Sequence, residues 1–322
     1  MFETWVSRSR RRRTPRLARV PSLDDTERAA LVALLHERPA GLTWTQIAFE
    51  AGQRGSALAL WRELHPADLF HDDGALPAPL AAAADDIRAW QADRSTLLTV
   101  LDHDYPPQLR EIHEIPPVIF CRGTLRPGES AVSVVGSRSA SRRGLDIARY
   151  VSAGLVDRGV TVVSGLARGV DTTAHTSALE GSGRTVAVLG CGTKHYYPAE
   201  NRELQDRIAT EGLVISQFFP DVAPRRQQFP MRNAVMSGYS RATIVVEAGE
   251  KSGARIQARQ AVAHGRPVIL TDLVVDSNEW ARHLVSQPGV YVASGTAEVM
   301  KLVEAIVAAD AEIDEMMAAT RG

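Results

Sequence analysis

Apolar residues fall into short runs that alternate with amphipathic segments over residues 131–270. The runs Val132–Val135 and Val160–Val163 are rich in β-branched residues and too short for helices, which is typical of strands buried on both faces of a sheet. Between them, from Arg143 to Arg158, apolar residues recur at helical spacing. A strand, a helix and a second strand within about thirty residues predict one right-handed crossover of a parallel sheet.

The alternation continues along the chain. Four further strand-like runs are Thr185–Leu189, Leu213–Ser216, Ala242–Val246 and Pro267–Leu270. Candidate helices cover Asp171–Glu180, Glu200–Thr210, Met231–Ser237, Ser252–His264 and Thr296–Met317. This order of elements predicts an α/β fold with a doubly wound, mostly parallel sheet.

The segment before the sheet is predicted to be a small helical N-terminal module. Ser22 is a candidate N-cap for a helix that ends near Arg38. The run LTWTQIAFEAG within Gly41–Gly55 is compatible with the first half of a helix-turn-helix, but the expected recognition helix, Ser56–Leu64, carries Arg62 as its only cation. We therefore favour helical packing over a duplex-reading role, which stays open.

The pattern divides the chain into four parts. Residues 1–21 hold many arginines and almost nothing apolar, which predicts a disordered arm. Residues 22–82 form the helical module and a linker, the linker being the proline- and alanine-rich stretch 71–82. Residues 83–295 form the Rossmann-like domain, and residues 296–322 form the C-terminal helix.

The amino-acid composition limits the cellular compartment and the classes of binding partner that we expect for this protein. The chain has 322 residues, of which 44% are hydrophobic, and a net charge of −1, so nucleic-acid binding requires a local basic patch. Its two cysteines, Cys121 and Cys191, lack metal-ligand spacing and suit a reducing cytoplasm. No apolar run approaches the roughly 18 residues of a membrane span. We expect a cytoplasmic protein with no membrane partner.

Small residues and a cation occur together at the strand ends. The segments are GSR (136–138), SGLARG (164–169), GCGTKHYYPAEN (190–201), FPMRNAVMSGYSR (229–241) and AGEKSGAR (248–255). Their basic residues are Arg138, Arg168, Lys194, Arg232, Lys251 and Arg255. Loops at the carboxyl ends of parallel strands meet at one edge, and small residues let backbone N–H groups approach a phosphate. The segments therefore predict a positively charged shelf for several phosphates in a row.

Other functional classes lack their signatures. No G-x-G-x-x-G follows the early strands and no G-x-x-x-x-G-K-[ST] is present, which disfavours dinucleotide and P-loop sites. His175, His195 and Cys191 have no spacing that joins them into a catalytic group, and no metal-ligand spacing occurs. Asp171 is placed to cap a helix. Glu247, at the end of the fifth strand, is the one carboxylate whose position suggests a site, and its alternative role is to accept loop N–H groups. We expect no catalytic residues, no metal and no cofactor.

Aromatic residues near the shelf favour a nucleic-acid strand over a lone mononucleotide. Bases of single strands need flat side chains on which to stack. The aromatic residues within or beside these loops are Tyr196, Tyr197, Phe218, Phe219, Phe229 and Tyr239.

Several collinear motifs resemble the DNA-processing protein A family (DprA, also called Smf). The matching segments are YPPQL (105–109), PPVIFCRG (116–123), SVVGSR (133–138), SGLARGVDTTAH (164–175), VAVLGCG (186–192), YPAENREL (197–204), FPMRN (229–233) and VVEAGEKSGARIQARQA (245–261). The resemblance covers about residues 83–275. It implies an extended Rossmann domain that binds single-stranded DNA, forms a homodimer, and loads a RecA-type recombinase during natural transformation.

The resemblance also selects residues for DNA contact. It points to Arg138, Lys194 and Arg232, with Ser252 and Gly253 supplying backbone N–H groups. The complete predicted DNA-binding set is Gly136, Ser137, Arg138, Ser164, Gly165, Arg168, Lys194, Arg232, Asn233, Lys251, Ser252 and Gly253. The chain departs from the family at Ala234, where a second arginine is usual.

Alternative functions remain at this point. The runner-up is a nucleotide-binding sensor or a hydrolase of nucleoside monophosphates on the related fold, including a role in phage defence. That hydrolase family carries P-G-G-x-G-T-x-x-E, whereas the corresponding stretch here is AGEKSGARIQA (248–258), without the final glutamate. A regulator that binds duplex DNA through residues 43–64 is a third possibility.

Overall fold

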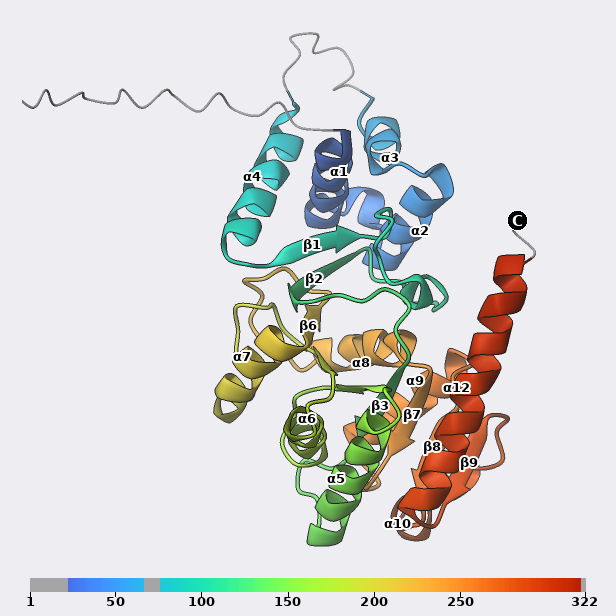
Figure 1. The fold of residues 1–322 in the computed structure, drawn as a ribbon. Coiled ribbons are helices and arrows are strands. Elements are labelled where there is room, and N and C mark those ends of the chain that lie inside the picture. The colour runs from blue at the N-terminus through green and yellow to red at the C-terminus, as the bar shows by residue number, and fades with distance from the viewer. Residues whose placement is uncertain (1–22, 67–75, 320–322) are drawn as a thin grey trace, which may run out of the picture.

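The centre of the molecule is a nine-stranded sheet, seen in a computed structural model that describes residues 23–66 and 76–319 (Figure 1). The strands are β1 (Thr96–Thr99), β2 (Val118–Gly123), β3 (Ala131–Val135), β4 (Thr161–Ser164), β5 (Thr185–Val188), β6 (Leu213–Ser216), β7 (Ala242–Val245), β8 (Val268–Thr271) and β9 (Val290–Ala293). Their spatial order is β1-β2-β6-β5-β4-β3-β7-β8-β9. The pairs β1–β2 and β2–β6 are antiparallel, and all the other pairs are parallel.

Strand β3 shows why the short apolar runs become central strands. All of its residues are buried, and successive side chains point to opposite faces. Val132 and Val134 belong to the core on one face of the sheet, whereas Ala131 and Val135 belong to the core on the other. A strand covered on both sides has no polar face, so its sequence shows a continuous run instead of an alternation. The prediction of a doubly wound, mostly parallel α/β sheet is confirmed.

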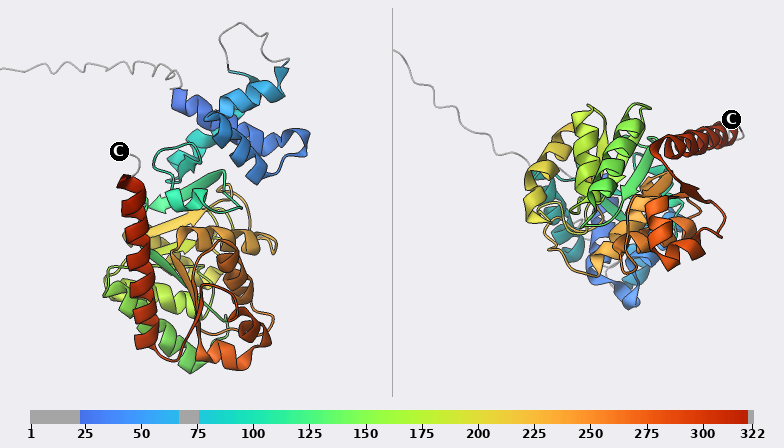
Figure 2. Two further views of the ribbon diagram at one scale, coloured as in Figure 1. Left: turned by 90° about the vertical axis from the view of Figure 1, so that its right-hand side faces the viewer. Right: turned by 90° about the horizontal axis from the view of Figure 1, so that it is seen from below.

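Helices cover both faces of the sheet (Figures 1 and 2). One face carries α5 (Arg142–Val156), α6 (Val170–Glu180) and the long α12 (Thr296–Ala319). The opposite face carries α8 (Gln228–Tyr239), α9 (Gly253–Ala263) and the short α10 (Asp272–Ser277) and α11 (Glu279–Leu284). Helix α7 (Arg202–Glu211) packs beside α6, and short 3-10 turns occupy Pro39–Gly41, Pro107–Arg110 and Ala199–Asn201. Within the described ranges, no helix is both long and apolar enough to cross a membrane.

The direction of winding reverses between β3 and β7. From β3 the chain proceeds to β4 and β5 on one side, and it returns later to place β7 on the other side of β3. The loops after these two neighbouring strands therefore leave in opposite directions and open a crevice between them. Open α/β sheets bind their ligands at such a switch point.

The N-terminal helices α1 (Leu23–Glu37), α2 (Trp44–Arg54), α3 (Ala57–Leu64) and α4 (Ala78–Ala92) gather beyond β1 and β2 (Figure 1). Their core continues into the sheet, because Leu97 of β1 and Val118 and Phe120 of β2 join it. The predicted linker 71–82 is wrong for residues 78–82, which form the first turns of α4. Prolines are tolerated in the first turn of a helix, where no intrahelical N–H bond is lost.

Helix α4 also changes the predicted division of the chain. The boundary placed at residue 83 cuts through α4, whose apolar face packs in the core of the helical module. The predicted arm 1–21 and the candidate N-cap Ser22 lie outside the described residues, as do the last three residues of the predicted C-terminal helix.

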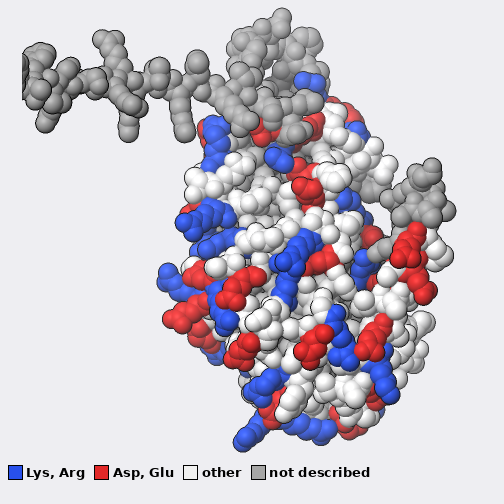
Figure 3. Space-filling model, in the orientation of Figure 1, with Lys and Arg blue, Asp and Glu red and all other residues white. Residues whose placement is uncertain are grey.

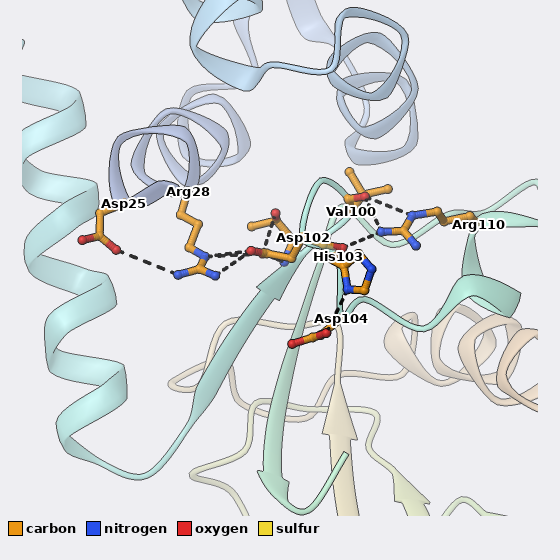
Figure 4. Close-up of polar contacts among 8 residues, drawn as sticks. Asp25, Arg28, Val100, Asp102, His103, Asp104 and Arg110 are labelled. Atoms are coloured by element: carbon orange, nitrogen blue, oxygen red, sulfur yellow. Dashed lines mark hydrogen bonds and ion pairs between the residues drawn. The ribbon is translucent and has the colours of Figure 1, made fainter. Parts of the chain in front are cut away.

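A partly buried ion pair joins the helical module to the sheet (Figure 4). The guanidinium of Arg28 on α1 lies 2.5 Å from Oδ1 of Asp102, which follows β1. Thr99 donates both its N–H and its hydroxyl to the same carboxylate, at 2.7 and 2.8 Å. Burial opposes ionisation of Asp102, but these hydrogen bonds outweigh it and hold its pKa below the ordinary value. Arg110 secures the same turn by donating to the carbonyls of Val100 and Asp102.

An aromatic cluster forms a second joint between the two parts. Phe219, in the loop after β6, stacks on His36 with ring centroids 4.6 Å apart and on Trp90 at 5.2 Å. It also meets Trp44 and Phe120 edge-on. The loop that begins at Gln217 is therefore fastened at its start to the helical module.

Candidate functional site

A cavity of about 1270 Å³ opens where the sheet reverses its winding. Three segments line it: residues 135–139 after β3, residues 224–236 before and within α8, and residues 249–257 before and within α9. Ala167 and Asp171, around the start of α6, and Tyr197 complete the lining. We call this cavity the switch-point pocket.

The loop after β3 is held tightly against its neighbours. The N–H of Ser137 donates to the carbonyl of Glu247 at 2.7 Å, and the Ser137 carbonyl accepts from the N–H of Val170 at 3.2 Å. A Cβ on Gly136 would lie 2.6 Å from Cγ2 of Val170, so a larger residue would push the loop away from α6. This packing directs Arg138 outward, where its side chain is exposed and its guanidinium carbon lies 5.6 Å from the ring centroid of Phe229.

Glu247, shortly after β7, also fixes the loop that follows β3. Its carboxylate accepts the N–H of Ser141 at 3.0 Å and the Ser141 hydroxyl at 2.6 Å. Glu247 therefore has the alternative role, accepting a loop N–H group, and it is not part of the pocket lining. The Glu247 carboxylate is thus bonded to Ser141, and Arg138 lines the pocket.

Arg232 forms the floor of the pocket. Its side chain is buried, and its Nη1 donates to the carbonyls of Gly165 and Val188 while its Nε donates to Oδ1 of Asn233. Burial lowers the pKa of Arg232, and the nearby carboxyl of Asp171 acts in the opposite direction. The guanidinium thus ties the carboxyl ends of β4 and β5 together and places a positive charge beneath the pocket.

Asp171 lies in the first turn of α6, whose N-cap is Gly169. The prediction that Asp171 caps this helix is therefore corrected. Its carboxylate instead accepts the N–H of Ala167 at 3.3 Å, in the loop before the helix. Burial raises the pKa of Asp171, and Arg232 and the loop N–H groups offset this only in part.

The N-terminus of α9 lines the pocket with Ser252 and the exposed Gly253, while the N–H groups of Ala254 and Arg255 are bonded within the turn. Ser252 caps the helix by accepting the N–H of Ala254 at 3.2 Å, and Lys251 before it is exposed. A Cβ built on Gly253 meets nothing within 4 Å, so the helix terminus is accessible to a ligand. Helix N-termini with free N–H groups attract anions, and the neighbouring lysine adds to this attraction.

The structure brings eight of the twelve predicted DNA-binding residues into the lining of this pocket. They are Gly136, Ser137, Arg138, Arg232, Asn233, Lys251, Ser252 and Gly253. Two others lie beneath it, since Gly165 accepts from Arg232 and the Ser164 hydroxyl donates to the carbonyl of Val134.

The last two, Arg168 and Lys194, are engaged in ion pairs outside the lining. Arg168 pairs with Glu200. Lys194 lies 3.2 Å from Asp93 and 2.9 Å from Asp221, and the hydrogen bond with Asp221 is the main reason that its pKa is raised. Lys194 thus links the end of α4 to the loop after β6.

Two exposed arginines in the pocket lining, Arg225 and Arg226, are not among the predicted residues. They precede α8 instead of following a strand, so a search restricted to strand ends passes over them. The available signal is the Arg-Arg pair that two glutamines separate from FPMRN.

The groups considered for catalysis have other roles. Burial lowers the pKa of His175 to about 3, and its Nδ1 lies 2.7 Å from the hydroxyl of Thr185. Burial raises the pKa of the Cys191 thiol to about 11, so the thiolate is scarce at neutral pH. His195 contacts the carbonyl of Asp221 through Nε2. Among the residues described, no three His, Cys, Asp or Glu side chains are grouped to hold a metal ion.

Charge outside the pocket is mixed. On the face shown in Figure 3, blue and red side chains lie next to one another over most of the surface. Several cations outside the pocket lining have a carboxylate partner, as Arg149 has with Asp146 and Arg158 with Glu304. Attraction for a polyanion therefore depends on local cations such as those of the pocket.

Comparison with known proteins gives consistent results. The sequence profile described as DNA recombination-mediator protein A matches residues 96–306. Protein Smf of Synechocystis sp. is 44% identical over 183 residues, which are 55% of this chain and 46% of that protein. DNA processing protein DprA of Streptococcus pneumoniae is 38% identical over 200 residues, which are 61% of this chain and 71% of that protein.

Solved structures agree in fold. The X-ray structure of the Streptococcus pneumoniae protein superposes with a TM-score of 0.67 at 30% identity, covering 86% of this chain and 97% of that one. DNA processing protein A from Helicobacter pylori superposes with a TM-score of 0.57 at 22% identity, covering 65% and 94%. The sequence match spans about half the length of the cyanobacterial relative and a larger share of the pneumococcal one.

Proposed function

Because the chain belongs to the DNA recombination-mediator protein A family, we propose that it binds single-stranded DNA in the switch-point pocket and thereby mediates recombination. The observation that carries the proposal is the combination of exposed cations with an open helix terminus. Arg138, Arg225, Arg226 and Lys251 surround the N-terminus of α9. Guanidinium groups and backbone N–H groups are the usual partners of phosphate oxygens.

Single strands suit this pocket better than a duplex. The aromatic rings of Tyr197 and Phe229, 5.4 Å apart, lie in the lining, and Tyr197 is 41% exposed. An unpaired strand can stack its bases on such rings, whereas a duplex hides them. The Helicobacter pylori structure describes a single-stranded DNA binding mode for that protein.

The partners and surroundings follow from the family resemblance. A RecA-type recombinase would receive the bound strand, the protein would act as a homodimer, and the reaction would take place in the cytoplasm. Of the predicted DNA contacts that line the pocket, the less buried ones are proposed to touch the strand directly, namely Gly136, Ser137, Arg138, Lys251, Ser252 and Gly253. The buried Arg232 and Asn233 are proposed to support them from the floor. Ser164, Gly165 and Lys194 are proposed to hold the surrounding loops, and Arg168 to lie at the rim.

Titration with labelled single-stranded and duplex DNA of one length, at two salt concentrations, tests the proposal. We expect tighter binding of the single strand and a steep dependence on salt, because each neutralised phosphate adds about 0.7 to the logarithmic slope. Equal affinity for both forms would contradict it.

One observation favours a second function, hydrolysis or sensing of a free nucleotide. Asp171 places a buried carboxyl with a raised pKa in the pocket wall, as a general acid would be placed. Incubation with nucleoside monophosphates distinguishes the two functions. Release of free base would favour hydrolysis, binding of an unchanged nucleotide would favour sensing, and neither binding nor release would favour strand binding.

A further inference from the structure

The inner wall of the switch-point pocket contains a buried amide without a hydrogen-bond partner. Gln257 lies on α9, one turn after Gly253, and only 1% of its surface is exposed. Neither its Oε1 nor its Nε2 has a partner in the described part of the chain. Burying an amide in this state is costly, so buried polar groups in native proteins are nearly always paired.

Gln257 differs in its position from other buried residues whose polar atoms lack partners. Gln108 and Gln205, for example, each leave only the carbonyl oxygen unpaired and lie outside the lining of the pocket. Gln257 leaves both of its polar atoms unpaired and lines the pocket. Each of these two atoms has almost no exposed surface of its own, so a ligand can complete the amide only when the side chain turns towards the pocket.

The hydrogen-bonding groups of an amide determine which part of a DNA strand can pair with it. A carboxamide presents a donor and an acceptor side by side, whereas phosphate oxygens only accept and would leave Oε1 unpaired. A nucleobase edge presents a donor beside an acceptor, and glutamine makes such paired contacts with bases. Met236 and Ala254, which also line the pocket, give this end an apolar surface suited to a base.

We propose that Gln257 binds the hydrogen-bonding edge of one nucleobase of the bound strand, so that a base enters the pocket while its phosphates stay at the mouth. This inference rests on the proposed function. The cations Arg138 and Lys251 and the α9 terminus hold the backbone, and the amide holds the base. All four bases have an edge with a neighbouring donor and acceptor, so the site requires a base without selecting a sequence.

Two strands of equal length and phosphate number test the proposal, one with its bases and one built of abasic residues. We compare the unaltered protein, Gln257→Leu, and the control Gln108→Leu, which makes the same change at a buried glutamine outside the pocket. Gln257→Leu should weaken binding of the normal strand about tenfold and leave binding of the abasic strand unchanged. The control should alter neither.

Thermal unfolding of the free protein provides a second measurement. Gln257→Leu removes an unpaired buried amide, so its melting temperature should be equal to or above that of the unaltered protein. An equal loss for both strands, or no loss for either, would overturn the inference and indicate an amide completed by water only. If the unaltered protein binds neither strand, the proposed function itself has failed.

Discussion

Replacing Arg138 by alanine should weaken the binding of single-stranded DNA without weakening the fold. The side chain is exposed, lines the pocket and lies 5.6 Å from the Phe229 ring. An arginine in this position can give two N–H groups to one phosphate. A hydrogen bond to a charged group contributes roughly 1–3 kcal/mol, so the dissociation constant should rise about 5- to 150-fold.

The salt dependence gives a more specific measure of the same change. Loss of one phosphate contact should lower the logarithmic salt slope by about 0.7. Arg138→Lys should recover only part of the affinity, because an ammonium group cannot make the planar double contact. Fluorescence anisotropy with a labelled oligonucleotide at several salt concentrations measures both quantities.

A matched control removes an arginine of similar exposure elsewhere. Arg149 on α5 pairs with Asp146 and lies outside the pocket lining, so Arg149→Ala should leave affinity and salt slope nearly unchanged. If Arg138→Ala lowers the melting temperature as much as the affinity, Arg138 is a structural residue. A stable Arg138→Ala variant with undiminished binding would remove it from the site.

Two further predictions concern stability. Gly165→Ala should lower the free energy of unfolding by about 1–3 kcal/mol in chemical unfolding, because its Cβ would overlap the guanidinium of Arg232. The control Gly253→Ala has open space around its Cβ and should change the free energy of unfolding by less than about 0.5 kcal/mol. The pKa of Asp102 is lowered in the folded state, so the stabilisation by Arg28 is fully present above the unfolded value near pH 4 and is lost as the pH falls below it. Urea unfolding at pH 6 and pH 3 should therefore show a smaller loss of stability for Asp102→Asn than for the unaltered protein, and an equal loss would refute this account.

The central part of the fold was predictable because its strands are buried on both faces. Strands β3 to β8 each appear in the sequence as a short apolar run, and the segments between them have helical periodicity. The edge strand β9 could not be found in this way. It is half covered, with Tyr291 41% exposed, so it contains no continuous buried run. Tertiary position, which local sequence does not record, decides such strands.

The candidate site was predictable where it depends on loops after strands. Gly136, Ser137 and Arg138 follow β3 directly, and their place at the pocket follows from the topology. The environment of Lys194 could not be foreseen, because its partners Asp93 and Asp221 come from distant parts of the chain. The unpaired amide of Gln257 could not be predicted either, since a sequence does not show which buried side chains lack partners.

The packing of Phe219 against the helical module limits how far the chain can be truncated from its N-terminal side. The loop after β6 carries Phe219 near one end and Arg225 and Arg226 at the other, so it spans the distance from the helical module to the pocket. A fragment that starts at residue 96, where the family match begins, would keep the whole sheet but lose His36, Trp44 and Trp90. The loop after β6 would keep its contacts with Gly192 and Lys194 but lose its aromatic packing against the helical module. A fragment that preserves the switch-point pocket should therefore begin before residue 96, at the first helix.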